Sequence, residues 1–170
     1  MFEIGDYIVY GNNGVCKIES VGVMDSPIAQ KDEIYYTLCP FYTKGSKIFT
    51  PANNSKVVMR RIITKKEAMD LIEAIQNIDC LSFTDKRRRE IEYKDALKKC
   101  DCKELIRIIK TIYLLKQERL NEGKKITAGD EKFFHMAEEN LYGELAIALE
   151  LDKIKVKEYI IDRIENLQAI

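Results

Sequence analysis

Histidine is almost absent from this sequence, which has one, His135, in 170 residues. A single histidine excludes most histidine-based catalysis and most zinc sites that combine His with Cys. The chain also lacks a glycine-rich phosphate loop and a G-x-S-x-G nucleophile motif. No apolar run approaches the roughly 20 residues that cross a bilayer, and the start MFEIGDY has no signal-peptide pattern. We therefore expect a cytoplasmic protein that is not an enzyme, uses no metal or other cofactor and does not enter a membrane.

Cysteine is scarce and unevenly placed, with five residues in all. An odd number in a reducing compartment indicates reduced side chains and not a disulfide framework. Cys100-x-Cys102 lacks a second cysteine pair at metal-binding spacing, so we interpret both as structural.

A net charge is missing as well, because 28 Lys and Arg balance 28 Asp and Glu. This neutrality hides a separation of charge along the chain. Residues 84–125 hold 14 basic and 8 acidic residues, whereas residues 126–170 hold 5 basic and 10 acidic residues. The positive field is therefore concentrated in the middle of the chain.

Proline is rare, and all three prolines lie within the first 51 residues together with five of the eight glycines. These residues punctuate short strands and turns. The clearest turn is YGNNGV at 10–15, where Gly and Asn tolerate the positive φ of a tight hairpin. The predicted strands are rich in Val, Ile, Tyr, Phe and Thr and are GDYIVY, VCKIESVGV, EIYYTLCPFY, KIFT and KVVMR. Five short strands predict a small SH3-like or Tudor-like β-barrel over residues 1–62.

Helical patterns begin at Thr64, which forms a predicted capping box with Glu67. Asp101 and Thr127 mark further helix starts, and Gly123 marks a stop. Together with helices over 84–100 and after Asp152, this gives about five helices. We predict an α+β chain with the β-barrel first, a short hinge, and an all-helical domain over residues 64–170, each folding separately.

Four basic residues in a row, Lys86, Arg87, Arg88 and Arg89, stand at the start of the predicted helix 84–100. The commoner interpretation of such a run is a solvated helix face with local ion pairs. However, only Glu90 and Glu92 lie near the arginines, and the helix dipole disfavours cations in the first turns. Because the arginine fork suits phosphate oxygens, a nucleic-acid backbone is the alternative.

The order of several motifs resembles the CarD/CdnL family of bacterial transcription regulators. The N-terminal pattern G-D-x-[IV]-V-Y-x-x-x-G is present from Gly5 to Gly14. The remaining motifs follow in the same order and are YKDALKK at 93–99, LLKQERL at 114–120, TAGD at 127–130 and GELA at 143–146.

This resemblance implies a Tudor-like domain that binds the β subunit of RNA polymerase, and a helical domain that contacts promoter DNA and stabilises the open complex. It implies that Lys86, Arg87, Arg88 and Arg89 meet the DNA backbone, and that the protein is nucleoid-associated through the polymerase. In the barrel it implies a polymerase contact on the strand with Lys47, Phe49 and Thr50. We expect a monomer.

Two features differ from the family pattern. Many members have a wedge tryptophan just before the basic cluster, whereas this chain has no Trp and places Ser82 or Phe83 there. Phe49 stands where relatives can carry a basic residue, so we expect a more apolar polymerase contact. The sequence leaves open whether Phe49 is this exposed anchor or a core residue, and whether Phe83 is a wedge or a hydrophobic staple.

Two other functions are weighed against this one. The first is a protein-interaction adaptor with a Tudor-like barrel and no DNA role. The second is an RNA-binding barrel, which is weak because residues 1–62 carry seven basic residues against six acidic ones.

Overall fold

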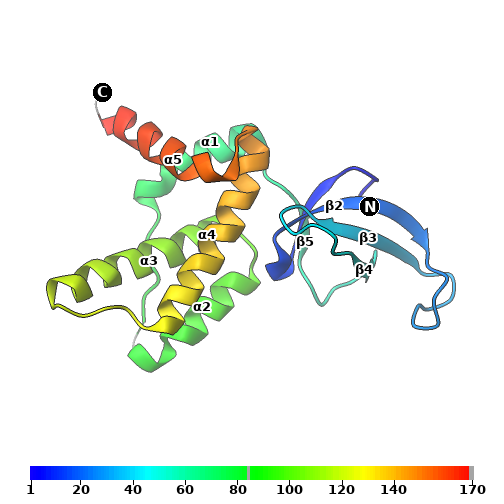
Figure 1. Ribbon diagram of the computed structural model, residues 1–170, viewed down its shortest axis with the longest axis horizontal. Coiled ribbons are helices and arrows are strands. Elements are labelled where there is room, and N and C mark those ends of the chain that lie inside the picture. Colours follow the sequence, from blue (N-terminus) through cyan, green and yellow to red (C-terminus); the bar gives the residue numbers. More distant parts are fainter. Residues whose placement is uncertain (84, 169–170) are drawn as a thin grey trace. The chain divides into compact units, whose positions relative to one another are not determined.

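The computed structural model of the protein describes residues 1–83 and 85–168 and divides the chain into two compact units, Met1–Ile62 and Ile63–Ile170. The first unit contains the strands and the second contains the α-helices (Figure 1). This confirms the predicted order of a β part followed by a helical part.

The first unit is a five-stranded antiparallel sheet with the strand order β4-β3-β2-β1-β5. Its strands are β1 (Tyr7–Tyr10), β2 (Val15–Val23), β3 (Ile34–Pro40), β4 (Ile48–Pro51) and β5 (Met59–Arg61). The core of this unit consists of the alternate side chains that face inward, namely Ile8, Tyr10, Cys16, Ile18, Tyr36 and Leu38. Strand alternation is thus the cause of this core.

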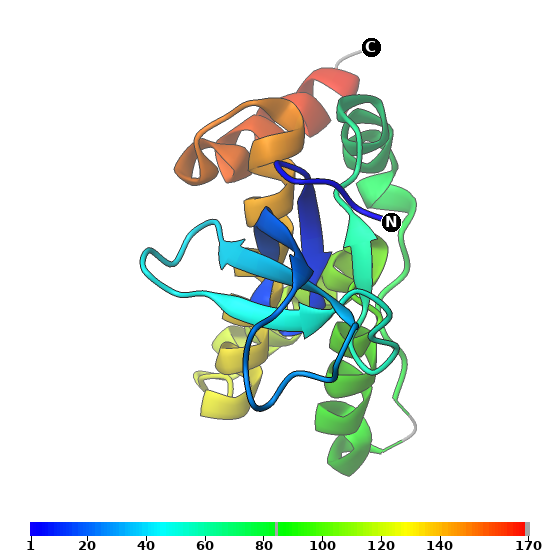
Figure 2. The same cartoon turned by 90° about the vertical axis from the view of Figure 1, so that its right-hand side faces the viewer.

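A closed Tudor-like barrel is not confirmed, because among the described residues β4 and β5 are the two edges of the sheet and do not pair with each other. The sheet is nevertheless strongly curled, with the dark-blue β1 running across the direction of the cyan strands (Figure 2). A register shift between Ile18 and Ser20 in β2 adds to this curvature. Curling, together with apolar side chains outside the ladder such as Phe2 and Val57, covers the core without closure.

The predicted hairpin at YGNNGV joins β1 and β2 through the short 3-10 turn η1 (Gly11–Asn13). Gly11 and Gly14 have φ angles of +50° and +69°, whereas the two asparagines stay out of the positive-φ region. At Gly11 a Cβ would lie 2.8 Å from Cγ1 of Val57. The two glycines therefore supply the reversal, and the asparagines are not needed for it.

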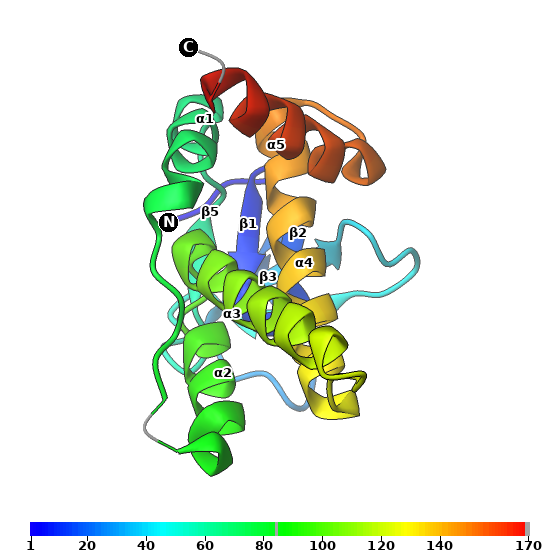
Figure 3. The same ribbon diagram turned by 90° about the vertical axis from the view of Figure 1, so that its left-hand side faces the viewer.

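Five α-helices lie within the described part of the second unit (Figure 3). They are α1 (Lys65–Ala74), α2 (Arg89–Lys98), α3 (Cys102–Asn121), α4 (Ala128–Leu149) and α5 (Lys153–Gln168), with short 3-10 turns η2 (Ile75–Asn77) and η3 (Lys86–Arg88). The helix predicted over 84–100 is therefore shorter than expected, since its first residues form η3.

The predicted helix starts are confirmed by their hydrogen bonds. Thr64 with Glu67 and Thr127 with Asp130 form complete capping boxes, which satisfy exposed N–H groups at α1 and α4. The side chain of Asp101 accepts from two backbone N–H groups at the start of α3. Gly123, with φ +71°, follows the end of α3 as predicted.

Helix α4 is the centre of this unit and packs against the other four helices (Figure 3). For this reason it buries side chains around much of its circumference and not along one stripe. Helical spacing in the sequence predicts one buried stripe with Phe134, Ala137, Leu141 and Leu145, but Phe133 is the buried ring and Phe134 is only partly buried. The predicted position of the buried ring was therefore wrong by one residue. A helix that other helices contact on several sides has no single buried stripe.

Candidate functional site

Strand β4 is an edge of the sheet and carries an exposed aromatic ring. Phe49 keeps 53% of its surface exposed, which identifies it as a surface residue and resolves the alternative of a core position. It lies opposite Thr37 of β3. A large apolar side chain on an edge strand is a suitable anchor for a protein partner.

The backbone of Phe49 also faces the open edge. The N–H of Ala52 donates to the carbonyl of Ile34 of β3. This bond shows which residues of β4 are the ones that exchange backbone hydrogen bonds with β3. Because such pairs alternate along an antiparallel ladder, Phe49 occupies a position whose N–H and C=O point away from β3. Ring and backbone of one residue are thus both available to a partner strand.

The two neighbours of Phe49 predicted to contact the polymerase differ from it. Thr50 is fully buried, and its Oγ1 is hydrogen-bonded to the Tyr10 hydroxyl at 3.2 Å and the Asn54 amide at 2.9 Å. Thr50 therefore has a structural role, since alternation turns its side chain inward. Lys47 is exposed and pairs with Glu19 of β2 at 2.6 Å. The hydrogen bond from Lys47 lowers the pKa of Glu19 from its ordinary value.

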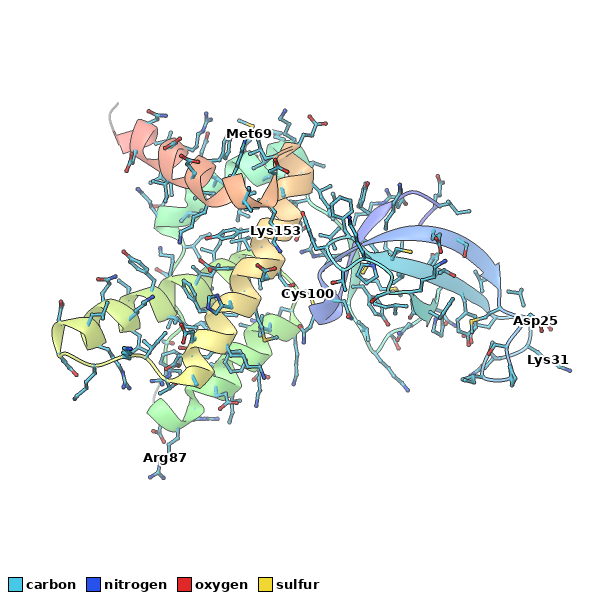
Figure 4. All side chains as sticks on the ribbon, viewed as in Figure 1. Asp25, Lys31, Met69, Arg87, Cys100 and Lys153 are labelled. Carbon is cyan, nitrogen blue, oxygen red and sulfur yellow. The ribbon has the colours of Figure 1, made fainter. Side chains whose placement is uncertain are left out.

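The basic run begins in the turn η3 and continues into α2. Asp85 starts this turn, because its side chain accepts from the N–H of Arg87 at 3.0 Å. The sequence also allows Thr84 as the cap of this helix, but Thr84 and the side chain of Lys86 lie outside the part of the chain that the structure describes. Arg87 and Arg88 are exposed, and among the described residues neither makes an ion pair. The Arg87 side chain extends away from the helices into solvent (Figure 4).

Arg89 is different from its two neighbours. Its guanidinium donates to Oδ2 of Asp130 at 2.8 Å, and the two side chains are 13% and 3% exposed. The prediction that all three arginines are weakly matched is therefore wrong for Arg89. Its partner lies 41 residues away in the sequence, beyond the reach of local ion-pair rules. Arg89 connects the start of α2 to the start of α4.

Phe83 packs on the core of the helical unit. Its ring meets Tyr93 edge-on, with ring centres 5.9 Å apart, and it is partly buried. Ser82 beside it is exposed. This is the geometry of a residue that anchors the chain before a helix, and insertion into DNA would first require the ring to leave Tyr93.

The other candidates from the sequence do not form a site. In residues 1–83 and 85–168, no three His, Cys, Asp or Glu side chains gather as a metal ion requires. His135 is exposed and lies 4.0 Å from Glu138. Cys100 and Cys102 are buried thiols. No helix of the described chain has the length and apolar character to cross a membrane.

Sequence reasoning missed three residues that shape these surfaces, namely Glu19, Asp130 and Tyr93. In the sequence, Asp130 appears only within the motif TAGD and Tyr93 only within the motif YKDALKK. The hydroxyl of Tyr93 is buried and has no hydrogen-bond partner among the described residues, a feature that helical spacing cannot reveal.

The five-stranded unit also matches a known protein family. Residues 2–63 match the CarD-like/TRCF RID domain. The matched range covers the whole five-stranded unit, including β4 and Phe49. The N-terminal unit is therefore similar to a CarD-like/TRCF RID domain.

Proposed function

We propose that this protein is a transcription regulator that binds the β subunit of RNA polymerase through strand β4 and contacts promoter DNA through the start of α2. The observation that carries the proposal is the exposed Phe49 on an open sheet edge, within a domain of a polymerase-binding family. Domains of this family bind the β subunit.

For the polymerase contact, β4 can bind a partner both through its main-chain N–H and C=O groups and through the side chain of Phe49. An extended partner segment that adds to this edge gains backbone hydrogen bonds, while the Phe49 ring fills an apolar pocket on the partner. Lys47 stands at the beginning of the same edge and contributes charge, in part neutralised by Glu19. Thr50 supports the strand from inside and does not take part in the contact.

For the DNA contact, Arg87 and Arg88 are the residues whose charge is available. Both stand at the N-terminal end of α2, where the helix dipole makes a cation unfavourable unless an anion is near. A phosphate would supply that anion. Arg89 holds the segment in place through Asp130 and leaves its neighbours to meet the backbone.

Stabilisation of the open complex follows from these two contacts without a wedge tryptophan. A few phosphate contacts give weak, salt-sensitive binding by themselves. Anchoring on the polymerase raises the effective concentration of the basic segment at the promoter. Because Phe83 is packed on Tyr93, backbone contacts carry more of the DNA interaction than an inserted ring.

The polymerase contact is tested with Phe49→Ala in the full chain. We expect β-subunit binding to weaken by about 1 kcal/mol or more, as for an interface anchor, with an almost unchanged melting temperature because the ring is exposed. Val23→Ala, which shortens another exposed apolar side chain at the end of β2, is the control and should bind normally. Equal binding by both variants would remove β4 from the interface.

The DNA contact is tested by the double variant Arg87→Glu and Arg88→Glu. Affinity for promoter DNA should fall by a similar factor for unrelated sequences, because backbone contacts carry no base information. The slope of log affinity against log salt should shrink by about 0.9 for each phosphate that the variant no longer neutralises. The control is Lys65→Glu with Lys66→Glu, an equal change of charge at the exposed start of α1. Unchanged affinity and slope in the first variant would favour the adaptor without a DNA role.

A further inference from the structure

The side chains beside Phe49 on the outer face of the sheet are uncharged. This face points away from the buried core, because side chains of a strand alternate between the two faces. Cross-strand pairing places two rows on it, and their members other than Phe49 are Ser20, Gly22, Tyr35, Thr37 and Pro51. The Ser20 hydroxyl donates to Oγ1 of Thr37 at 2.8 Å, so these two polar groups satisfy each other.

A β-bulge in β2 adds one more residue, Glu19, to the same face. The register of β2 against β3 shifts between Ile18 and Ser20, and the pairing skips Glu19. Ile18 and Val21 pack on the core, whereas Glu19 and Ser20 between them are both exposed. Strict alternation would turn these two consecutive side chains to opposite faces. The bulge therefore re-aims Glu19 toward the outer face.

Glu19 reaches across the sheet to the beginning of β4. Its Oε2 lies 2.6 Å from Nζ of Lys47, although β3 lies between β2 and β4 in the sheet. The thiol of Cys39, in this intervening strand, is a further hydrogen-bond partner of Glu19. The hydrogen bond with Glu19 raises the pKa of Lys47, so the lysine stays charged. The pair beside Phe49 thus has no net charge near neutral pH.

A second lysine of this face is directed away from β4. Lys17 of β2 lies opposite Cys39, but its Nζ lies over the ring of Tyr7 in β1, 5.7 Å from the ring centre. In the sheet, β1 and β4 lie on opposite sides of β2. The surface next to Phe49 therefore combines uncharged side chains with the Glu19–Lys47 ion pair.

This arrangement determines which partner segment fits the open edge. An extended segment that adds to β4 places residues opposite Lys47, Phe49 and Pro51 on the outer face, at every second position. A basic residue opposite Lys47 would meet a like charge, which is unfavourable. An acidic residue there would meet the charge of Glu19 and compete with it for the lysine. An uncharged residue avoids both costs.

We propose that Glu19 is a specificity-determining residue of the β4 contact and selects an uncharged, extended segment of the polymerase β subunit. The inference rests on the proposed polymerase contact and adds the chemistry of the partner. Glu19 compensates Lys47 before binding, so no acidic partner residue is needed and one is rejected. Apolar side chains of the segment then cover the Phe49 ring.

The test measures the affinity of the full chain for purified β subunit in three charge variants. Glu19→Gln leaves the Lys47 charge uncompensated and should weaken binding by about threefold, the scale of one exposed ion pair. Lys47→Met leaves the Glu19 charge alone and should weaken binding by a similar factor. The double variant has neither charge and should bind within about twofold of the wild type, because the two single effects are coupled.

The matched control is Asp25→Asn, which removes one exposed carboxylate from the loop between β2 and β3 and should bind as the wild type does (Figure 4). Both members of the Glu19–Lys47 pair are about half exposed, so the melting temperature should be almost unchanged in every variant. The wild type and the double variant should also share one salt dependence, since no partner charge is paired at this place.

Two results would overturn the inference. Tighter binding by Glu19→Gln, with weaker binding by the double variant, would show that Lys47 meets an acidic partner residue. Equal binding by the wild type and all three charge variants would show that Glu19 does not govern the contact. In both cases the polymerase contact still stands if Phe49→Ala weakens binding. If Phe49→Ala binds as the wild type does, the β4 contact and the inference are both wrong.

Discussion

At the scale of single residues, Asp130 has several roles at once. It completes the cap of α4 and accepts from Arg89, and both side chains of that ion pair are largely buried. Removing one member of a buried pair leaves the other charge without compensation. Asp130→Asn should therefore lower the free energy of unfolding by about 3 kcal/mol in urea denaturation. The exposed neighbour Glu131 gives the control, Glu131→Gln, with a change within about 0.5 kcal/mol. Similar losses of unfolding free energy in the two variants would show that the Arg89–Asp130 ion pair adds little to stability.

The sequence predicted some of these residue roles and not others. The helical period puts Tyr93, Ala96, Leu97 and Cys100 on one stripe of the predicted helix 84–100, and all four are buried, because burial on a helix follows its period. The same spacing continues the stripe back to Arg89 but places it beyond the edge of the core, whereas the Arg89 side chain is only 13% exposed. Its pairing with Asp130 could not be predicted, since it depends on how α4 packs against α2.

At the scale of elements, the two capping boxes have different surroundings. Thr64 at α1 is exposed, whereas the Thr127 hydroxyl also donates to Asp130 Oδ2 at 2.7 Å, within the buried pair. Thr64→Ala should cost about 1 kcal/mol of unfolding free energy, the usual value for a cap. Thr127→Ala should cost more, about 2 kcal/mol, since it also removes a hydrogen bond to a buried charge. Chemical denaturation of both variants checks the order, and equal costs would contradict it.

Helix starts were predictable because a capping box is a local pattern of four residues. Strand positions were also close, since β-branched and aromatic runs between turns are local too. Closure of the sheet was not predictable, because it depends on how far the whole sheet curls to bring its edge strands β4 and β5 together, and no local pattern encodes that curl. The open edge at β4, and with it the exposure of Phe49, became visible only in the structure.

At the scale of the whole molecule, the chain forms two units with separate cores, one in the sheet and one among the helices. A unit with its own core can in principle fold alone. We expect residues 1–62 and residues 64–170, expressed separately, to give two soluble pieces that each melt cooperatively in calorimetry. A lack of folding by both pieces would contradict the boundary.

The open edge of β4 has a consequence for the protein when its partner is scarce. An unpaired strand edge is a template for any other extended chain, including a second copy of the same protein. Pro51 removes one donor from this edge and Lys47 adds charge beside it, which reduces self-pairing. They leave the exposed Phe49 uncovered, so the open edge that we propose as the polymerase contact would also lower the colloidal stability of the unbound protein. Occupancy by the polymerase would then act as protection against aggregation as well as recruitment.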